Sequence, residues 1–151
     1  MIRRLALSAA LVLLGTACSC GGVPASSAYA TRQEAGGSVP AWVPAAATEL
    51  KMQSDEGTGA FWLRFRLAAA ERSAVEAELL RIPDLQVATL TFRAPKGVDW
   101  WFRGLVQVVP ARAKTVLAAD VYSGAGRAVP LRTFVAFDRA SDSVYAWSAG
   151  R

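Results

Sequence analysis

The sequence predicts an α+β domain: a small, mainly antiparallel sheet with one amphipathic helix packed on one of its faces. Three observations lead to this fold class. Apolar and polar residues alternate with a period of two over 61–67 and again over 129–137, as in strands that bury one face. Apolar residues recur at helical spacing over 73–82. Hydrophobic residues make up 53% of the chain and charged residues 19%, which is a composition that folds.

The predicted sheet begins with a hairpin. Residues 48–53 (TELKMQ) and 61–67 (FWLRFRL) alternate as strands, and the polar, glycine-bearing stretch 54–59 between them predicts the turn. The remaining strands are predicted by weaker alternation between turn residues. They are 85–92, 115–122, 129–137 and 143–147, with turns at 123–126 and 138–142.

One helix is predicted between these strands. Ser73 and Glu76 have the spacing of a capping box, and Pro83 would end the helix. An alternative start near Ala69 is indicated by the three alanines that precede Glu71. Three apolar residues fall on its inner face: Val75, Leu79 and Ile82. The helix would lie against the sheet through this face.

The first seventeen residues have the features of an export signal. Two arginines precede an apolar run over 5–14, which is too short to cross a bilayer as a helix. Residues 14–18 (LGTAC) resemble the lipobox of bacterial prolipoproteins. In that class the signal is removed and the cysteine becomes the lipid-bearing N-terminus. The resemblance implies lipidation of Cys18, anchoring to a membrane and, with Ser19 next to the cysteine, the periplasmic face of the outer membrane in a Gram-negative cell.

A second cleavage site competes with the lipobox. Residues 28–30 (AYA) fit an ordinary signal-peptidase site, and cleavage there would release a soluble periplasmic or secreted protein that begins at Thr31. Residues 18–44 are rich in Gly, Pro, Ser and Ala without apolar periodicity, so they predict a flexible linker. Trp42, between Pro40 and Pro44, is the exception, and we expect it to pack onto the domain rather than to serve as a free recognition element. The predicted organisation is therefore a signal over 1–17, this linker, and a single domain over 45–151.

The amino-acid composition limits the kinds of catalytic and metal site that the chain can form. The chain has no histidine, and its two cysteines, Cys18 and Cys20, precede the domain. This excludes Ser-His-Asp hydrolases, Cys-His proteases and histidine-containing zinc sites, and we expect no enzyme, metal or cofactor. A carboxylate-only hydrolase is the remaining enzymatic alternative, and it needs two of Asp99, Asp120 and Asp138 across one cleft. The positive charge forms no run, so no nucleic-acid partner is expected.

Two groups of residues are candidates for a binding surface. The first is the segment 99–103, with Trp100 and Trp101 flanked by Asp99 and Arg103. Adjacent aromatics cannot share one face of an extended chain, so one of them would face solvent and could hold a sugar ring or an apolar group of a partner. The alternative is that both tryptophans cover an open end of the sheet.

The second group is a stripe on the polar face of the strand 61–67, formed by Trp62, Arg64 and Arg66. Such a stripe suits phosphate or carboxylate groups of envelope polymers. The alternative is a solvated face whose arginines prevent aggregation through sheet edges.

Together these features predict an exported lipoprotein with a non-enzymatic binding domain. The partner would be an envelope protein or a cell-wall polymer, and a soluble binder or inhibitor is the alternative. The domain itself resembles small uncharacterised bacterial lipoproteins, a resemblance that implies no activity.

The lipobox predicts a specific mass. Protein from the membrane fraction should be diacylated and begin at Cys18, and the variant Cys18→Ser should lose this species because the thiol carries the lipid. Intact-mass spectrometry of both fractions checks this. An unlipidated product that begins at Thr31 in the soluble fraction would contradict the lipobox reading.

Overall fold

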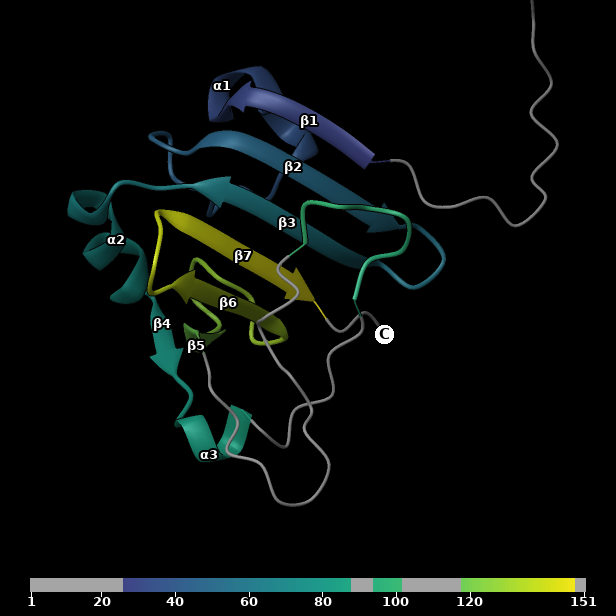
Figure 1. The fold of residues 1–151 in the computed structure, drawn as a ribbon. Helices are drawn as coiled ribbons and strands as arrows, with labels where there is room; N and C mark the ends of the chain where they lie inside the picture. The colour runs from purple at the N-terminus through teal and green to yellow at the C-terminus, as the bar shows by residue number, and fades with distance from the viewer. Residues whose placement is uncertain (1–25, 88–93, 102–117, 149–151) are drawn as a thin grey trace, which may run out of the picture.

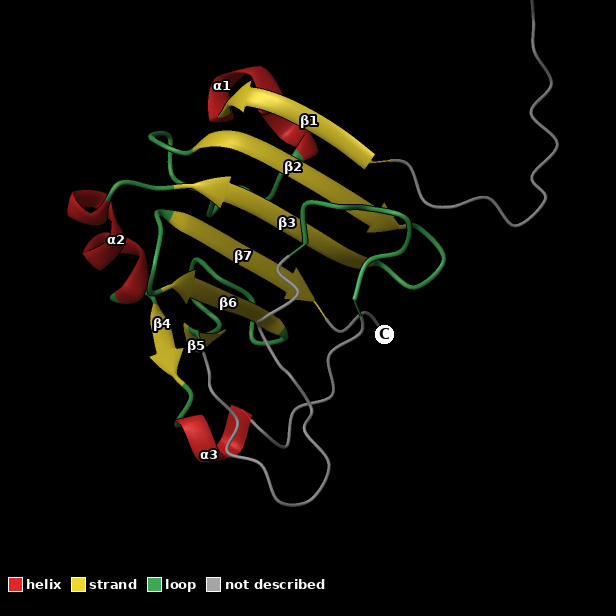
Figure 2. Cartoon of the chain, viewed as in Figure 1, coloured by secondary structure: helices red, strands yellow, loops and turns green. Residues whose placement is uncertain are grey.

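A computed structural model describes residues 26–87, 94–101 and 118–148. In this part of the chain, seven strands form one antiparallel sheet in the order β1-β2-β3-β7-β6-β5-β4 (Figure 1). The strands are β1 (Ser26–Thr31), β2 (Thr48–Asp55), β3 (Ala60–Arg66), β4 (Leu79–Arg81), β5 (Ala119–Gly124), β6 (Thr133–Asp138) and β7 (Ser143–Ser148). The helices are α1 (Arg32–Ala35), a 3-10 turn η1 (Gly36–Ser38), α2 (Ala69–Glu76) and α3 (Asp84–Val87). Figure 2 shows how strongly strands predominate, and the coarse prediction of a mainly antiparallel sheet with helical elements is confirmed.

The sheet joins two halves of the chain through one strand pair. Strands β1, β2 and β3 are neighbours in sequence and in space, as are β5, β6 and β7, and β3 pairs with β7 to connect them. Trp62 lies opposite Trp147, and Phe65 lies opposite Val144. The predicted hairpin over 48–67 and the predicted strand over 143–147 are confirmed by β2, β3 and β7.

Both faces of the sheet are buried, and we name them by their residues. The aliphatic face includes Leu50, Leu63, Phe65, Val135, Phe137 and Val144. The tryptophan face includes Trp62, Val121, Phe134, Ala136, Tyr145 and Trp147. Side chains alternate between these faces along each strand, as the strand geometry requires. The strand over 61–67 is therefore not half-buried as predicted, because its Trp62 side packs against other aromatics instead of facing water.

Residues 26–44 are part of the domain, so the predicted linker over 18–44 is wrong for this stretch. Strand β1 pairs with β2, and Val39 and Val43 belong to the core over the aliphatic face. Trp42 packs edge-on against Phe65, with 6.4 Å between ring centroids. This packing of Trp42 was predicted. The rest of the burial was not, because β1, α1 and η1 have at most six residues each and 39–44 has no regular structure, so no periodic pattern is long enough to detect. Residues 18–25 lie outside the described residues.

The predicted helix has the earlier of its two expected starts, but neither its capping box nor its expected end. Helix α2 begins at Ala69, with Ala68 at its N-cap, so Ser73 lies inside the helix and forms no capping box. The helix ends at Glu76, well before Pro83. Of the three predicted inner residues, only Val75 is on the helix. Leu79 is in β4 opposite Gly124, and the Ile82 N–H donates to the Val121 carbonyl. An apolar spacing of four and three fits both structures, and pairing with β5 decides between them. A single amphipathic helix over 73–82 on one face is not formed.

Three further strand predictions need correction. Residues 84–87 form α3, in which Gln86 and Val87 donate to the Pro83 carbonyl, while 88–93 lie outside the described residues. Strand β5 starts at Ala119 and extends through two residues of the predicted turn, and 115–117 are not described. Strand β6 starts at Thr133 instead of 129 because Pro130 cannot donate to a ladder. Within the described ranges, no helix is both long and apolar enough to cross a membrane.

One carboxylate ties several elements together at the α2 end of the sheet. Asp120 on β5 accepts hydrogen bonds from Arg139 at 2.8 Å, from Arg72 of α2 at 3.1 Å and from Arg81 of β4 at 3.2 Å. The Arg72 guanidinium also lies 4.4 Å from the centre of the Phe137 ring. Burial raises the pKa of Asp120, but the hydrogen bonds and charges of the arginines outweigh it, so the net pKa is lowered.

Replacing Asp120 should therefore cost stability in a pH-dependent way. Asp120→Asn should lower the free energy of unfolding at pH 7 by roughly 1–3 kcal/mol, as expected for lost charged hydrogen bonds. Because the folded pKa is lowered, the carboxylate stabilises the fold above its unfolded pKa of about 3.9 and loses this effect as pH falls below it. Denaturant unfolding at several pH values tests this. A gap between wild type and variant that stays constant down to pH 3 would contradict it.

Candidate functional site

The predicted aromatic surface is mostly buried. Trp62 is 4% exposed and Trp100 is 9% exposed, so neither can serve as a solvent-facing platform. The Trp100 indole donates to the Ser26 hydroxyl at 3.2 Å, which places it over the β1 end of the sheet. Trp101 is half-buried and meets Tyr145 edge-on, with 5.6 Å between ring centroids. Of the two adjacent tryptophans, only Trp101 retains substantial exposure, beside the aromatic cluster of the tryptophan face.

The other residues of segment 99–103 add little to this surface. Asp99 is exposed next to Trp100, while Arg103 lies outside the described residues, as does Cys18. The segment before it is held to the sheet by Gln53, a buried amide on β2. Gln53 donates to the Lys96 carbonyl at 2.9 Å and accepts from the Lys96 N–H at 3.2 Å. This pair of bonds fixes the backbone of an exposed lysine above β2.

Arg66 is neutralised by two carboxylates. Its guanidinium lies 3.2 Å from Glu49 and 3.7 Å from Asp142, and all three side chains are largely exposed. Pairs of this kind contribute little stability and offer little net charge to a ligand. Arg66 therefore belongs to a solvated ion network at the end of β3, in line with the alternative for the stripe.

Arg64 is in a different situation. It lies between Lys51 of β2 and Tyr145 of β7 in the sheet register, so the three side chains share the tryptophan face. Its terminal nitrogen donates to the Ser143 hydroxyl at 3.4 Å, a long bond. Its Nε is buried and, among the described residues, has no hydrogen-bond partner. A buried donor in this state costs about 1–3 kcal/mol.

Neither Arg64 nor Lys51 is paired with a carboxylate side chain. All twelve Asp and Glu residues of the chain lie within the described ranges. The ion pairs formed there use Arg66, Arg72, Arg81 and Arg139. Two neighbouring cations thus lie side by side without an ion pair to a carboxylate among the described residues, and like charges directly opposite each other destabilise a sheet.

An open groove adjoins this pair. It has a volume of about 300 Å³ and is lined by Ala28, Tyr29, Ala30, Glu49, Leu50 and Lys51. Lys51 lies opposite Ala28, and the small alanine side chains keep this part of the sheet shallow. A register shift between Thr48 and Lys51 shapes the groove, with Glu49 at a φ of 51°. That conformation is strained for a residue with a Cβ, and such strain is often kept at functional sites.

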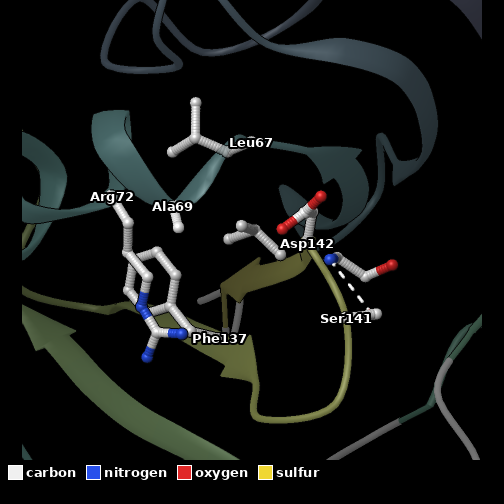
Figure 3. Close-up of a pocket in the computed structure, with 8 residues that line it drawn as sticks. Leu67, Ala69, Arg72, Phe137, Ser141 and Asp142 are labelled. Carbon is white, nitrogen blue, oxygen red and sulfur yellow. Dashed lines mark hydrogen bonds between the residues drawn. The ribbon is translucent and has the colours of Figure 1, made fainter.

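Elsewhere in the described structure we find a small cavity but no metal site. Figure 3 shows a cavity between α2 and the β6–β7 turn, beside Arg72, Phe137 and Asp142. It has a volume of about 30 Å³, which suits a water molecule but not a ligand. No three His, Cys, Asp or Glu side chains gather as a metal site among the described residues.

Asp120 and Asp138, two of the three carboxylates proposed for an enzyme, are not arranged as a pair. Asp120 is opposite Phe137 on the aliphatic side, whereas Asp138 is opposite Ala119, which packs on the tryptophan face. Asp138 accepts from Ala140 N–H and Ser141 Oγ within its own turn. Asp120 and Asp138 therefore point to opposite faces and cannot act on one substrate together.

Comparison with protein-family models, with curated proteins and with solved structures finds no match for the chain.

The candidate site is therefore the basic pair Lys51 and Arg64 with the adjoining groove and Trp101 nearby. The sequence indicated Arg64 but not Lys51. Lys51 sits in a strand of weak alternation, and only the register of β2 against β3 shows that it is next to Arg64.

The two kinds of basic residue should respond differently to charge removal. Lys51→Gln should leave stability unchanged or raise it by up to about 0.5 kcal/mol, because it relieves repulsion with Arg64. Arg66→Gln, the matched control, should lower stability by up to about 1 kcal/mol because it loses two ion pairs. Denaturant unfolding at low salt measures both. A clear loss of stability in Lys51→Gln would show that this lysine has a structural role.

Proposed function

We propose that the protein is exported, anchored to a membrane through lipid on Cys18, and binds an anionic component of the cell envelope without transforming it. The observation that carries the binding role is the pair Lys51 and Arg64, adjacent in register and without a carboxylate partner. A phosphate or carboxylate between these side chains would relieve their repulsion. A guanidinium also binds such groups through two parallel hydrogen bonds, which gives orientation as well as affinity.

The energetic cost of the site supports the same role. A like-charged pair and a buried Nε without a partner both lower the stability of the free protein. A sequence optimised only for folding would have other residues in place of Lys51 and Arg64. Their presence therefore favours a function that needs both cations. An oxyanion beside Lys51 and the Arg64 guanidinium would offset the repulsion between the two cations.

The position of β1 supports the lipid anchor. Cleavage after Ala30 would remove five of the six residues of β1 and expose β2 as the new edge. Cleavage before Cys18 leaves the sheet intact. Ser26 follows Cys18 by eight positions, a stretch of at most roughly 26 Å when extended, so the groove would lie close to the membrane. The soluble alternative would require the domain to fold without β1.

Binding to purified cell-wall sacculi tests the proposed role. The double variant Lys51→Gln/Arg64→Gln should bind at least about tenfold more weakly in co-sedimentation, because it loses both cations of the site. The control Arg127→Gln/Arg132→Gln removes the same charge from an exposed loop and should bind like wild type. An equal loss in both variants would indicate attraction by net charge alone. Release of soluble fragments from the sacculi would contradict a role without catalysis.

A further inference from the structure

Among the described residues, strand β1 is one edge of the sheet and has no strand paired beyond it, and β4 is the opposite edge. The edge strand β4 has three residues, one of which is Arg81 in the Asp120 network. Short strands that carry a charge are one way in which proteins prevent strand addition. Strand β1 has six mostly exposed residues (SSAYAT) with no charge and no proline. Figure 1 shows it as the outermost strand of the sheet.

The unpaired backbone groups of β1 can be located from the ladder. The Leu67 N–H donates to the Asp142 carbonyl. The backbone N–H and C=O groups of odd-numbered residues of β3 therefore point toward β7, and those of Arg64 point toward β2. Backbone N–H and C=O groups of successive residues point in opposite directions along a strand. Followed from Arg64 through Lys51 to β1, this alternation directs the backbone groups of Tyr29 toward β2 and those of Ala28 away from it. The Ala30 N–H agrees with this direction, since it donates to Glu34 at 2.8 Å instead of to β2. Ser26 and Ala28 thus present outward N–H and C=O groups, and Glu34 closes the edge beyond them.

The charge next to this edge selects the kind of strand that fits. Lys51 lies opposite Ala28 on the tryptophan face. A strand added beside β1 would place the residue facing Ala28 about two strand spacings from Lys51, roughly 10 Å between Cα atoms. A lysine and a glutamate side chain together span this distance, and the small Ala28 between them leaves the path open. Arg64 lies one strand further in and adds a second positive charge. Two carboxylates also adjoin this edge, but both have partners: Glu34 accepts from the Ala30 N–H and Glu49 pairs with Arg66.

We propose that the β1 edge binds an extended, acidic peptide segment, which adds a strand beside residues 26–28 and places a carboxylate against Lys51. This rests on the proposed function and makes it more specific, because it identifies the anionic partner as a polypeptide. Main-chain hydrogen bonds supply the affinity in such strand addition, and the acidic side chain supplies the selectivity.

The test uses a synthetic six-residue peptide that alternates glutamate and valine, and a counterpart with glutamine for glutamate. Wild-type protein binds both, and the acidic peptide binds more tightly. Ala28→Pro removes one outward N–H without removing a β1–β2 hydrogen bond, so the fold is kept and binding of both peptides falls at least about tenfold. Lys51→Gln weakens the acidic peptide by roughly two- to fivefold and leaves the glutamine peptide unchanged.

A second readout does not depend on any variant. Amide hydrogen exchange at Ala28 slows when the acidic peptide binds the wild-type protein. Binding with unchanged exchange at this amide, equal binding to Ala28→Pro, or no binding at millimolar peptide would each overturn the proposal. If Ala28→Pro binds sacculi like wild type while no peptide binds, the proposed function stands and the peptide assignment fails.

Discussion

The pairing of β3 with β7 determines the position of almost every other part of this domain. These strands are about eighty residues apart in sequence, and their central residues Leu63, Phe65, Val144 and Ala146 are fully or almost fully buried. The register has little freedom because both faces are packed. A slip by one residue would move Arg64 into the aliphatic face and the tryptophans out of their cluster. The neighbourhood of Lys51, Arg64 and Tyr145 is a direct consequence of this register.

A sheet that buries both faces needs a cover on each side, and the chain supplies the covers mainly from segments with little regular structure, in which α1 and η1 are the helical parts. The segment between β1 and β2 covers the aliphatic face through Val39, Val43 and Trp42. The tryptophan face is covered partly by Trp100 and Trp101, whose backbone approach is fixed by the bonds between Gln53 and Lys96. The basic pair lies beside this aromatic cover, and its cations are only partly buried. A binding surface therefore arises where packing gives way to charged residues on the same face.

The elements predicted correctly are those in which the local sequence pattern and the tertiary contacts favour the same secondary structure. Strand β3 has strict alternation, and the weaker patterns of β2 and β7 are bounded by clear turns. Leu79 shows the opposite case, because its spacing from Val75 favoured a helix while pairing with Gly124 placed it in a strand. In 26–44 only the packing of Trp42 was predicted, because the elements of this segment are too short to show a period. Cys18 and its lipid stay a prediction, and Arg103 lies outside the described residues.

The site was predictable only in part, for a related reason. Arg64 and Arg66 look equivalent on one strand, and the structure separates them by their neighbours: carboxylates for Arg66, and a lysine and a tyrosine for Arg64. Trp62 was assigned to the same stripe but is core, because the face it shares is covered. Cross-strand neighbours decide which charges are free to bind, and sequence spacing does not contain them.

The most direct measurement is the ¹H–¹⁵N signal of the Arg64 Nε–H, followed by NMR as inorganic phosphate is added. If Arg64 is the anion-binding residue, its Nε–H signal shifts and exchanges more slowly with water, while the Nε–H signals of Arg127 and Arg132 stay unchanged. Equal shifts for all three arginines, or a shift only at the exposed pair, would contradict the assignment of the site.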